Sequence, residues 1–115
     1  MKCPSPPRFA KQSNDGHLPA LPGITRKTLV YGAETLMTEF RLAQDSVLPR
    51  HSHPHEQTGY LVSGHLRLVI ETEEHDVAPG DSWCIPGNTE HEARALATSV
   101  AVEVFAPVRQ DYLPG

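Results

Sequence analysis

Short β-like runs separated by turn residues are the feature that most constrains the fold of this chain. From Thr25 onward, runs rich in β-branched and apolar residues alternate with turn segments, and no segment carries apolar residues at helical spacing. The expected strands are residues 29–31, 35–42, 47–48, 59–62, 66–71, 75–77, 82–85, 92–96 and 100–105. The expected hairpin connections are 72–74 and 97–99, and the expected turns are 79–81 and 86–88. Many short strands at close spacing predict an all-β fold, a jelly-roll-like barrel.

Length and charge narrow the classes of function. A chain of 115 residues forms one domain and buries roughly two-thirds of its unfolded surface. The formal charge of −4, without any Lys/Arg cluster, argues against a nucleic-acid partner. No apolar run approaches the roughly 20 residues of a membrane span, and the N-terminus lacks the hydrophobic core of a secretory signal. We therefore expect a cytoplasmic protein without a membrane or nucleic-acid partner.

Residues 1–28 are expected to form an N-terminal arm, and residues 29–115 a barrel with a C-terminal tail that caps its site. Prolines and glycines recur in residues 1–24, which show no periodic apolar pattern. Such an arm is either flexible or laid along the barrel or a partner subunit. Because exposed strand edges need covering, the arm predicts a homodimer, with exchange of the arm between subunits as one form of it.

The apolar run at residues 83–85 is expected to lie inside the barrel. Trp83 is expected to fill the interior, and Cys84 to be a buried small hydrophobe. Cys3 and Cys84 lie far apart and show no C-x-x-C spacing, so no disulfide framework is expected.

Histidines gather in two segments, residues 51–57 and 86–91. His51, His53 and Gln57 share one parity, so their side chains point the same way on an extended chain. Imidazole is the commonest metal ligand, and three imidazoles with one oxygen suit a divalent transition metal. The competing interpretation is a solvated loop that happens to be rich in histidine.

The two segments resemble the paired motifs of the cupin superfamily. The first motif is H-x-H, an acid four residues on and a glycine seven further, which here are His51, His53, Gln57 and Gly64. The second is a glycine, a proline six residues on and a histidine five further, which here are Gly80, Pro86 and His91. The short separation between the motifs is typical of small microbial cupins, and the resemblance covers residues 29–105. It implies a double-stranded β-helix fold, the jelly-roll barrel.

The resemblance also implies a ligand set for one divalent metal: His51, His53, Gln57 and His91. Gln57 stands where the family usually has an acid. Its carbonyl oxygen brings no charge, so a bound ion keeps its full positive charge and is a stronger Lewis acid. Nickel, zinc and manganese are therefore favoured, and iron also accepts imidazole ligands. Asp45 and Ala95 depart from the family pattern outside the ligand positions.

The C-terminal tail is similar to that of single-domain cupins of the pectin-degradation type, which convert unsaturated uronate sugars to linear keto forms. In that group an acid, a Phe and an Arg lie over the metal, and the matching positions are Glu103, Phe105 and Arg109. The usual acid is Asp, so Glu103 is one methylene longer. The resemblance implies catalytic roles for Glu103 and Arg109 and substrate contact for Phe105. From the residues alone, Glu103 is either a general acid/base or an ion-pair partner of Arg109. Arg109 either binds a substrate carboxylate or is a solvated charge.

His55 and Tyr60 complete the predicted substrate-binding residues. Pro54 interrupts the strand between His53 and His55, so His55 is assigned to substrate contact or ligand support rather than ligation. Tyr60 precedes an apolar run and is expected in the core, with its hydroxyl near the site.

These residues predict a metal-dependent isomerase or tautomerase whose small-molecule substrate is a carboxylate-bearing sugar or keto compound. One alternative is a non-haem iron dioxygenase, although the missing carboxylate ligand weighs against it. The other alternative is a barrel that binds a small ligand without catalysis, because one fold hosts many functions.

Overall fold

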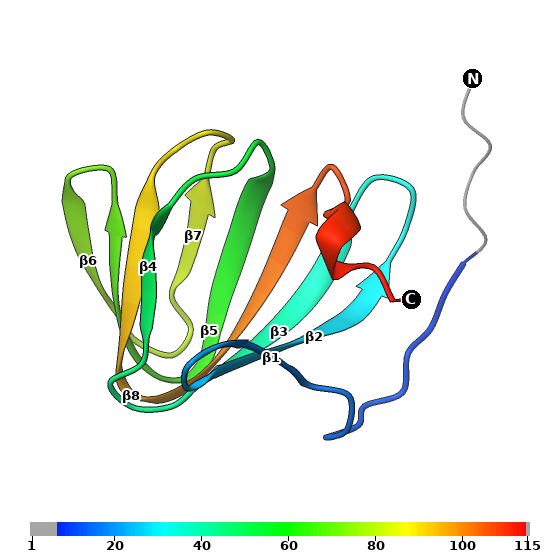
Figure 1. Ribbon diagram of the computed structural model, residues 1–115, viewed down its shortest axis with the longest axis horizontal. Helices are drawn as coiled ribbons and strands as arrows, with labels where there is room; N and C mark the ends of the chain where they lie inside the picture. The colour runs from blue at the N-terminus through cyan, green and yellow to red at the C-terminus, as the bar shows by residue number, and fades with distance from the viewer. Residues whose placement is uncertain (1–6, 115) are drawn as a thin grey trace.

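The computed structural model describes residues 7–114 and contains eight β-strands and one short 3-10 helix in that range (Figure 1). The strands are β1 (Leu18–Leu21), β2 (Ile24–Tyr31), β3 (Leu36–Leu42), β4 (Val47–His51), β5 (Glu56–Ile70), β6 (Glu73–Val77), β7 (Ser82–Ile85) and β8 (His91–Ala106). The 3-10 helix is η1 (Gln110–Tyr112). The predicted all-β, jelly-roll fold is confirmed. No helix among residues 7–114 is long and apolar enough to cross a membrane.

Two long strands, β5 and β8, connect the two faces of the barrel. They pair antiparallel from Glu56–Ala106 to Ile70–His91. One face has the order β1-β2-β3-β8-β5-β7, because β3 pairs the C-terminal half of β8 and β7 pairs the N-terminal half of β5. The other face has the order β4-β8-β5-β6, built on the remaining halves. Figure 1 accordingly shows β5 and β8 between β6 at one end of the molecule and β2 and β3 at the other.

Both long strands bend near their middle, and on β8 the bend falls at the expected hairpin connection 97–99. The β5–β8 register shifts between Leu61 and Leu66, and Gly64 has a φ of 99°. At this bend the Ser99 hydroxyl accepts a hydrogen bond from the His65 backbone N–H at 3.0 Å and donates one to the Ala97 carbonyl at 2.7 Å. The prediction of a hairpin connection at 97–99 is therefore wrong. Small and polar residues mark a bulge inside a continuous strand, because the serine hydroxyl replaces ladder bonds that the bend interrupts.

The N-terminal segment is more ordered than an arm. Residues 18–21 and 24–31 form β1 and β2, joined by a tight connection at Pro22 and Gly23, and β2 pairs antiparallel with β3. The expectation that residues up to 24 form no element is wrong from Leu18 onward, since a short edge strand tolerates proline. Residues 7–17 lie against β2 and β3, where Lys27 Nζ donates to the Ser13 carbonyl at 2.9 Å. The first six residues of the expected arm lie outside the described residues.

The apolar core lies between the two faces. Its buried residues come from six strands: Ile24, Leu42, Leu61, Leu66, Leu68, Val77, Ile85, Ala93, Ala95 and Ala101. Trp83 is half-buried and packs against this core, whereas Cys84 is exposed. The expectation of a buried Cys84 is wrong, because strand alternation on β7 sends Trp83 and Ile85 inward and Cys84 outward. A second cluster, Leu36, Phe105 and Val108, packs beneath the C-terminal tail.

The bend predicts that the stability of the fold depends strongly on Gly64. A Cβ at this position would lie 2.1 Å from Ser99 Oγ and 2.5 Å from the Thr98 carbonyl oxygen. Gly80 has a similar φ of 93° but open space around its Cα. Gly64→Ala and Gly80→Ala should therefore share the backbone strain of about 1–2 kcal/mol. Gly64→Ala should lose about 1–3 kcal/mol more in free energy of unfolding, measured by urea denaturation. Equal losses in the two variants would contradict this account of the bend.

Candidate metal centre and active site

Three of the predicted ligands meet inside the barrel. His51 ends β4, His53 lies in the following loop, and His91 begins β8 directly opposite His51. Each offers one ring nitrogen, and these nitrogens all lie within 4.8 Å of one another. The ring centroids of His51 and His91 are 4.2 Å apart, and those of His53 and His91 are 5.1 Å apart. The cluster therefore has the dimensions of a metal-binding triad.

Backbone carbonyls fix the orientation of all three rings. The Nδ1 atom of each histidine lies 2.8–2.9 Å from a carbonyl oxygen, and the oxygens belong to Pro49 for His51, His55 for His53 and Thr89 for His91. A carbonyl only accepts, so each Nδ1 carries the proton and each Nε2 presents a lone pair. This is the outer support that metal-binding histidines generally have. His91 Nε2 is buried and has no hydrogen-bond partner among the described residues.

The contact between His53 and Gln57 tests whether a cation fits. His53 Nε2 lies 2.7 Å from Gln57 Oε1, while Gln57 Nε2 donates to Glu103 Oε2 at 2.6 Å. Burial lowers the pKa of His53, which favours its neutral form. The lone pair of His53 Nε2 then faces a lone pair of Gln57 Oε1, and the two repel each other at this distance. A cation placed between the ligands removes this repulsion, because both lone pairs point at it. The three histidines and the Gln57 carbonyl oxygen thus fit a divalent metal.

Glu103 lies next to this ligand set. Its Oε1 accepts a hydrogen bond from the Trp83 indole at 2.9 Å, and its Oε2 accepts the bond from Gln57. Burial raises the pKa of the Glu103 carboxyl to about 7, against the lowering effect of the two hydrogen bonds and of the Arg109 charge. The alternative of an ion pair with Arg109 is wrong, because the Arg109 guanidinium pairs with Asp111 at 2.8 Å.

The C-terminal tail forms the wall around the site. The Arg109 guanidinium stacks 4.0 Å from the Tyr112 ring centroid and 5.0 Å from that of Phe105. Phe105 is buried and meets the His53 ring edge-on at 5.8 Å. Arg109 is thus held as part of the wall, and the alternative of a freely solvated charge is wrong: its side chain is 16% exposed. Its charge contributes to the lowered pKa of His53 and of His91, after the larger effect of burial.

The two remaining predicted residues differ in position. The His55 ring lies 5.6 Å from the His53 ring, and its backbone carbonyl supports His53, but it is not part of the triad. Tyr60 is 50% exposed, so its placement in the core is wrong. Strand alternation is the reason: Gln57, Gly59 and Leu61 point inward from β5, which sends Tyr60 outward.

Sequence reasoning missed two residues of this site. The sequence predicts only a packing role for Trp83 and assigns no role to Tyr112, which lies in the C-terminal tail. Trp83 reaches Glu103 because of the register between β7, β5 and β8, which no local pattern encodes. Tyr112 reaches Phe105, at 5.5 Å between ring centroids, because η1 turns the tail back onto the barrel. Three polar residues of the site, Gln57, His91 and Glu103, also line an interior cavity of about 50 Å³ that is otherwise largely apolar.

Comparison with known proteins agrees with this geometry. The Cupin domain family model matches residues 38–106, so the chain belongs to the cupin family. More particularly, it is a small cupin similar to the pectin degradation protein KdgF of Dickeya dadantii, with 30% identity over 93 residues that cover 79% of this chain and 84% of that protein.

Solved structures show the same relationship. KdgF from Halomonas sp. superposes with a TM-score of 0.89 at 29% identity, covering 94% of this chain and 100% of that one. An RmlC-like cupin from Shewanella frigidimarina gives a TM-score of 0.88 at 20% identity, covering 95% and 98% of the two chains, and shares the fold. The cupin resemblance read from the sequence is confirmed.

The triad predicts that divalent metal stabilises the protein through His91. Nickel or zinc at about 100 times its dissociation constant should add about 2.7 kcal/mol to the free energy of unfolding, or a Tm rise of about 10 °C. His91→Ala should abolish this rise and lower the metal content, measured by calorimetry and elemental analysis. His65→Ala is the matched control, because His65 pairs with Asp76 away from the triad and its loss should leave the metal-dependent rise intact. A similar rise in His91→Ala would contradict the ligand assignment.

Proposed function

We propose that this cupin is a metal-dependent isomerase or tautomerase acting on a small carboxylate-bearing sugar, of the unsaturated uronate class. The observation that carries the proposal is the continuous contact from the histidine triad through Gln57 to the enclosed carboxyl of Glu103. The similarity to proteins named for pectin degradation supports the uronate class, because pectin is a polymer of uronates. A divalent ion held by the triad and Gln57 supplies Lewis-acid polarisation of a substrate oxygen.

The reaction is an isomerisation and needs no second reactant. In a cyclic unsaturated uronate, the ring oxygen joins the anomeric carbon to a carbon of the double bond. The anomeric hydroxyl loses a proton, the bond from the anomeric carbon to the ring oxygen breaks, and an aldehyde forms. The freed ring oxygen takes up a proton and becomes an enol. The enol loses that proton while the adjacent carbon of the double bond gains one, which gives the linear keto form.

Glu103 is the proposed proton carrier for these transfers. Each oxygen of its carboxyl accepts one hydrogen bond, from Trp83 or Gln57, and a carboxylate oxygen has capacity for a further one. The carboxyl is thereby held next to the ligand set while a lone pair stays available for a substrate proton. A group held in this way exchanges protons without the cost of reorganising its surroundings.

Arg109 is the proposed partner of the substrate carboxylate. Its planar guanidinium is held flat against Tyr112 and Phe105, and its Nε and Nη2 atoms already bind the Asp111 carboxylate in a forked arrangement. A substrate carboxylate has the same shape and charge as that of Asp111. It binds by sharing the guanidinium with Asp111 or by displacing it. The aromatic contacts keep the guanidinium in the site wall in either case.

The proposed role of Glu103 predicts a large loss of turnover in Glu103→Gln. The amide cannot carry the proton, so kcat on an unsaturated uronate should fall at least about 100-fold when the metal site is saturated. Decay of the ultraviolet absorbance of the substrate double bond gives the rate, and elemental analysis gives the metal content. Glu92→Gln is the control, since Glu92 lies on the same strand and pairs with Arg50 at the surface. Full turnover in metal-loaded Glu103→Gln would refute the proton-carrier role. Absence of turnover by the unaltered protein with every metal tested would leave a ligand-binding barrel.

We also propose that the protein is a homodimer. The outer edge of β1 has no strand partner within residues 7–114, and all four of its residues are exposed, including Leu18 at 57%. Phe9, in the segment that precedes β1, is 88% exposed. An unpaired edge beside exposed apolar side chains favours pairing with a second copy.

The dimer predicts twice the chain mass of 12.7 kDa in size-exclusion chromatography with light scattering. Leu18→Asp together with Leu21→Asp should give the monomer mass, because charges on an edge strand oppose pairing. Tyr60→Asp, at an exposed position of β5, is the control and should keep the dimer. A monomer mass for the unaltered chain would overturn the proposal.

A further inference from the structure

Four inward-facing positions form one row across the sheet next to the ligand set. Thr38 on β3 pairs with Glu103 on β8, Glu103 pairs with Gly59 on β5, and Gly59 pairs with Trp83 on β7. Adjacent strands lie about 4.8 Å apart, so the backbones at Glu103 and Trp83 are separated by two strand spacings. The hydrogen bond between Trp83 and Glu103 nevertheless spans this gap at 2.9 Å.

Gly59 makes this reach possible. A Cβ at residue 59 would lie 2.1 Å from Trp83 Cε2 and 2.3 Å from Trp83 Nε1. The indole therefore lies flat across the glycine backbone, in the space that any other residue of β5 would fill. A glycine within a strand often marks such a close approach. The glycine and the tryptophan thus act as a pair, since either one without the other would leave a gap or a clash.

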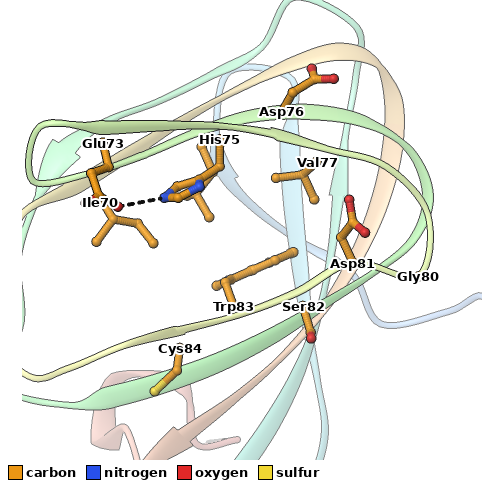
Figure 2. A pocket seen from close by; sticks show the side chains of 11 residues that line it. Ile70, Glu73, His75, Asp76, Val77, Gly80, Asp81, Ser82, Trp83 and Cys84 are labelled. Atoms are coloured by element: carbon orange, nitrogen blue, oxygen red, sulfur yellow. Dashed lines mark ion pairs between the residues drawn. The ribbon is translucent and has the colours of Figure 1, made fainter.

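The indole also separates the site from an outer groove. Figure 2 shows Trp83 between the β6 residues His75 to Val77 and the neighbouring residues Ser82 and Cys84 of β7, in a groove of about 690 Å³. Trp83 and Leu68 line both this groove and the interior cavity that contains the Glu103 and Gln57 side chains. One side of the indole thus borders the groove, while its N–H points inward to Glu103.

We propose that Trp83 is a positioning residue that fixes Glu103 and, through Glu103, turns the amide oxygen of Gln57 toward the three histidines. The proposal deepens the proposed function and rests on its metal site. The donor and acceptor of each hydrogen bond around Glu103 follow from the chemistry of the groups. The indole N–H only donates and the ionised carboxylate only accepts, so ionised Glu103 receives a bond from each neighbour. Gln57 can satisfy Glu103 only through its NH₂ group, which leaves its carbonyl oxygen facing His53.

Loss of the indole N–H should release this orientation. Glu103 Oε1 would lose its partner, and the carboxyl would be free to rotate. The Gln57 amide would then be able to turn over and present its NH₂ group, which cannot ligate a metal, to the histidines. If Trp83 merely fills space, an isosteric ring without the N–H would leave the metal affinity unchanged.

The experiment uses the fact that Trp83 is the sole tryptophan of the chain. Biosynthetic replacement of tryptophan by β-(3-benzothienyl)alanine exchanges the N–H for sulfur and keeps the size of the ring. The Co²⁺ dissociation constant and the Co²⁺ visible spectrum are then compared with those of the unaltered protein. We expect about tenfold weaker binding, as for other outer supports of metal ligands, together with a changed visible spectrum that reports the altered ligand set.

Two further variants serve as controls. Gly59→Ala, which displaces the ring, should also weaken Co²⁺ binding and change the spectrum. Cys84→Ser, at the next position of β7, should leave both measurements unchanged.

The outcomes separate this inference from the proposed function. An unchanged Co²⁺ affinity and spectrum in the benzothienyl protein would overturn the positioning role and leave the metal site intact. If the unaltered protein binds no Co²⁺, the metal-dependent function fails instead. The ¹⁵N-labelled Gln57 side-chain signals of the metal-free protein then decide the inference: a shift on benzothienyl replacement supports it, and identical signals overturn it.

Discussion

β5 and β8 pair from Glu56–Ala106 to Ile70–His91, and this ribbon bends midway at Gly64 and Ser99. Gln57 lies at one end of the ribbon and His91 at the other. Without the bend, these two residues would be separated by most of the length of a long strand. With it, the two ends of the ribbon face each other across the barrel interior, where His51 joins from β4. The candidate metal centre therefore depends on the bend as directly as on its own side chains.

The candidate ligands are oriented by residues at very different distances along the sequence. Each histidine is oriented by a carbonyl close to it in sequence, so the triad is supported locally by the loops that carry it. Gln57, in contrast, is oriented by Glu103 and Trp83, which are distant in sequence and are brought close only by strand register. Local support holds the imidazole donors, whereas support from the whole barrel holds the oxygen donor. A change in sheet packing should therefore affect Gln57 before it affects the histidines.

Sequence reasoning succeeded where the information is local. The spacing of His51, His53 and His91 indicated a cluster that the structure does bring together, and the runs of β-forming residues predicted the all-β fold. The assignment of Gln57 as a fourth ligand stays a prediction. Sequence reasoning failed where the position of a side chain depends on the register between distant strands or on which face of a strand the residue occupies. The bend at Ser99 looked like a turn, because a bulge and a turn use similar residues. Tyr60 and Cys84 looked internal by their neighbours, yet the alternation of β5 and β7 places both outside. No local pattern connects Trp83 to Glu103, since their contact crosses an intervening strand.

The single tryptophan has a practical consequence. Because its indole donates to Glu103 and borders both the groove and the interior cavity, all tryptophan fluorescence of the chain originates beside the candidate site. Indole emission responds to nearby charge and to water. An ion or a small molecule that bound next to Glu103 would therefore change an optical signal that the natural protein already carries, so occupancy could be followed without any label.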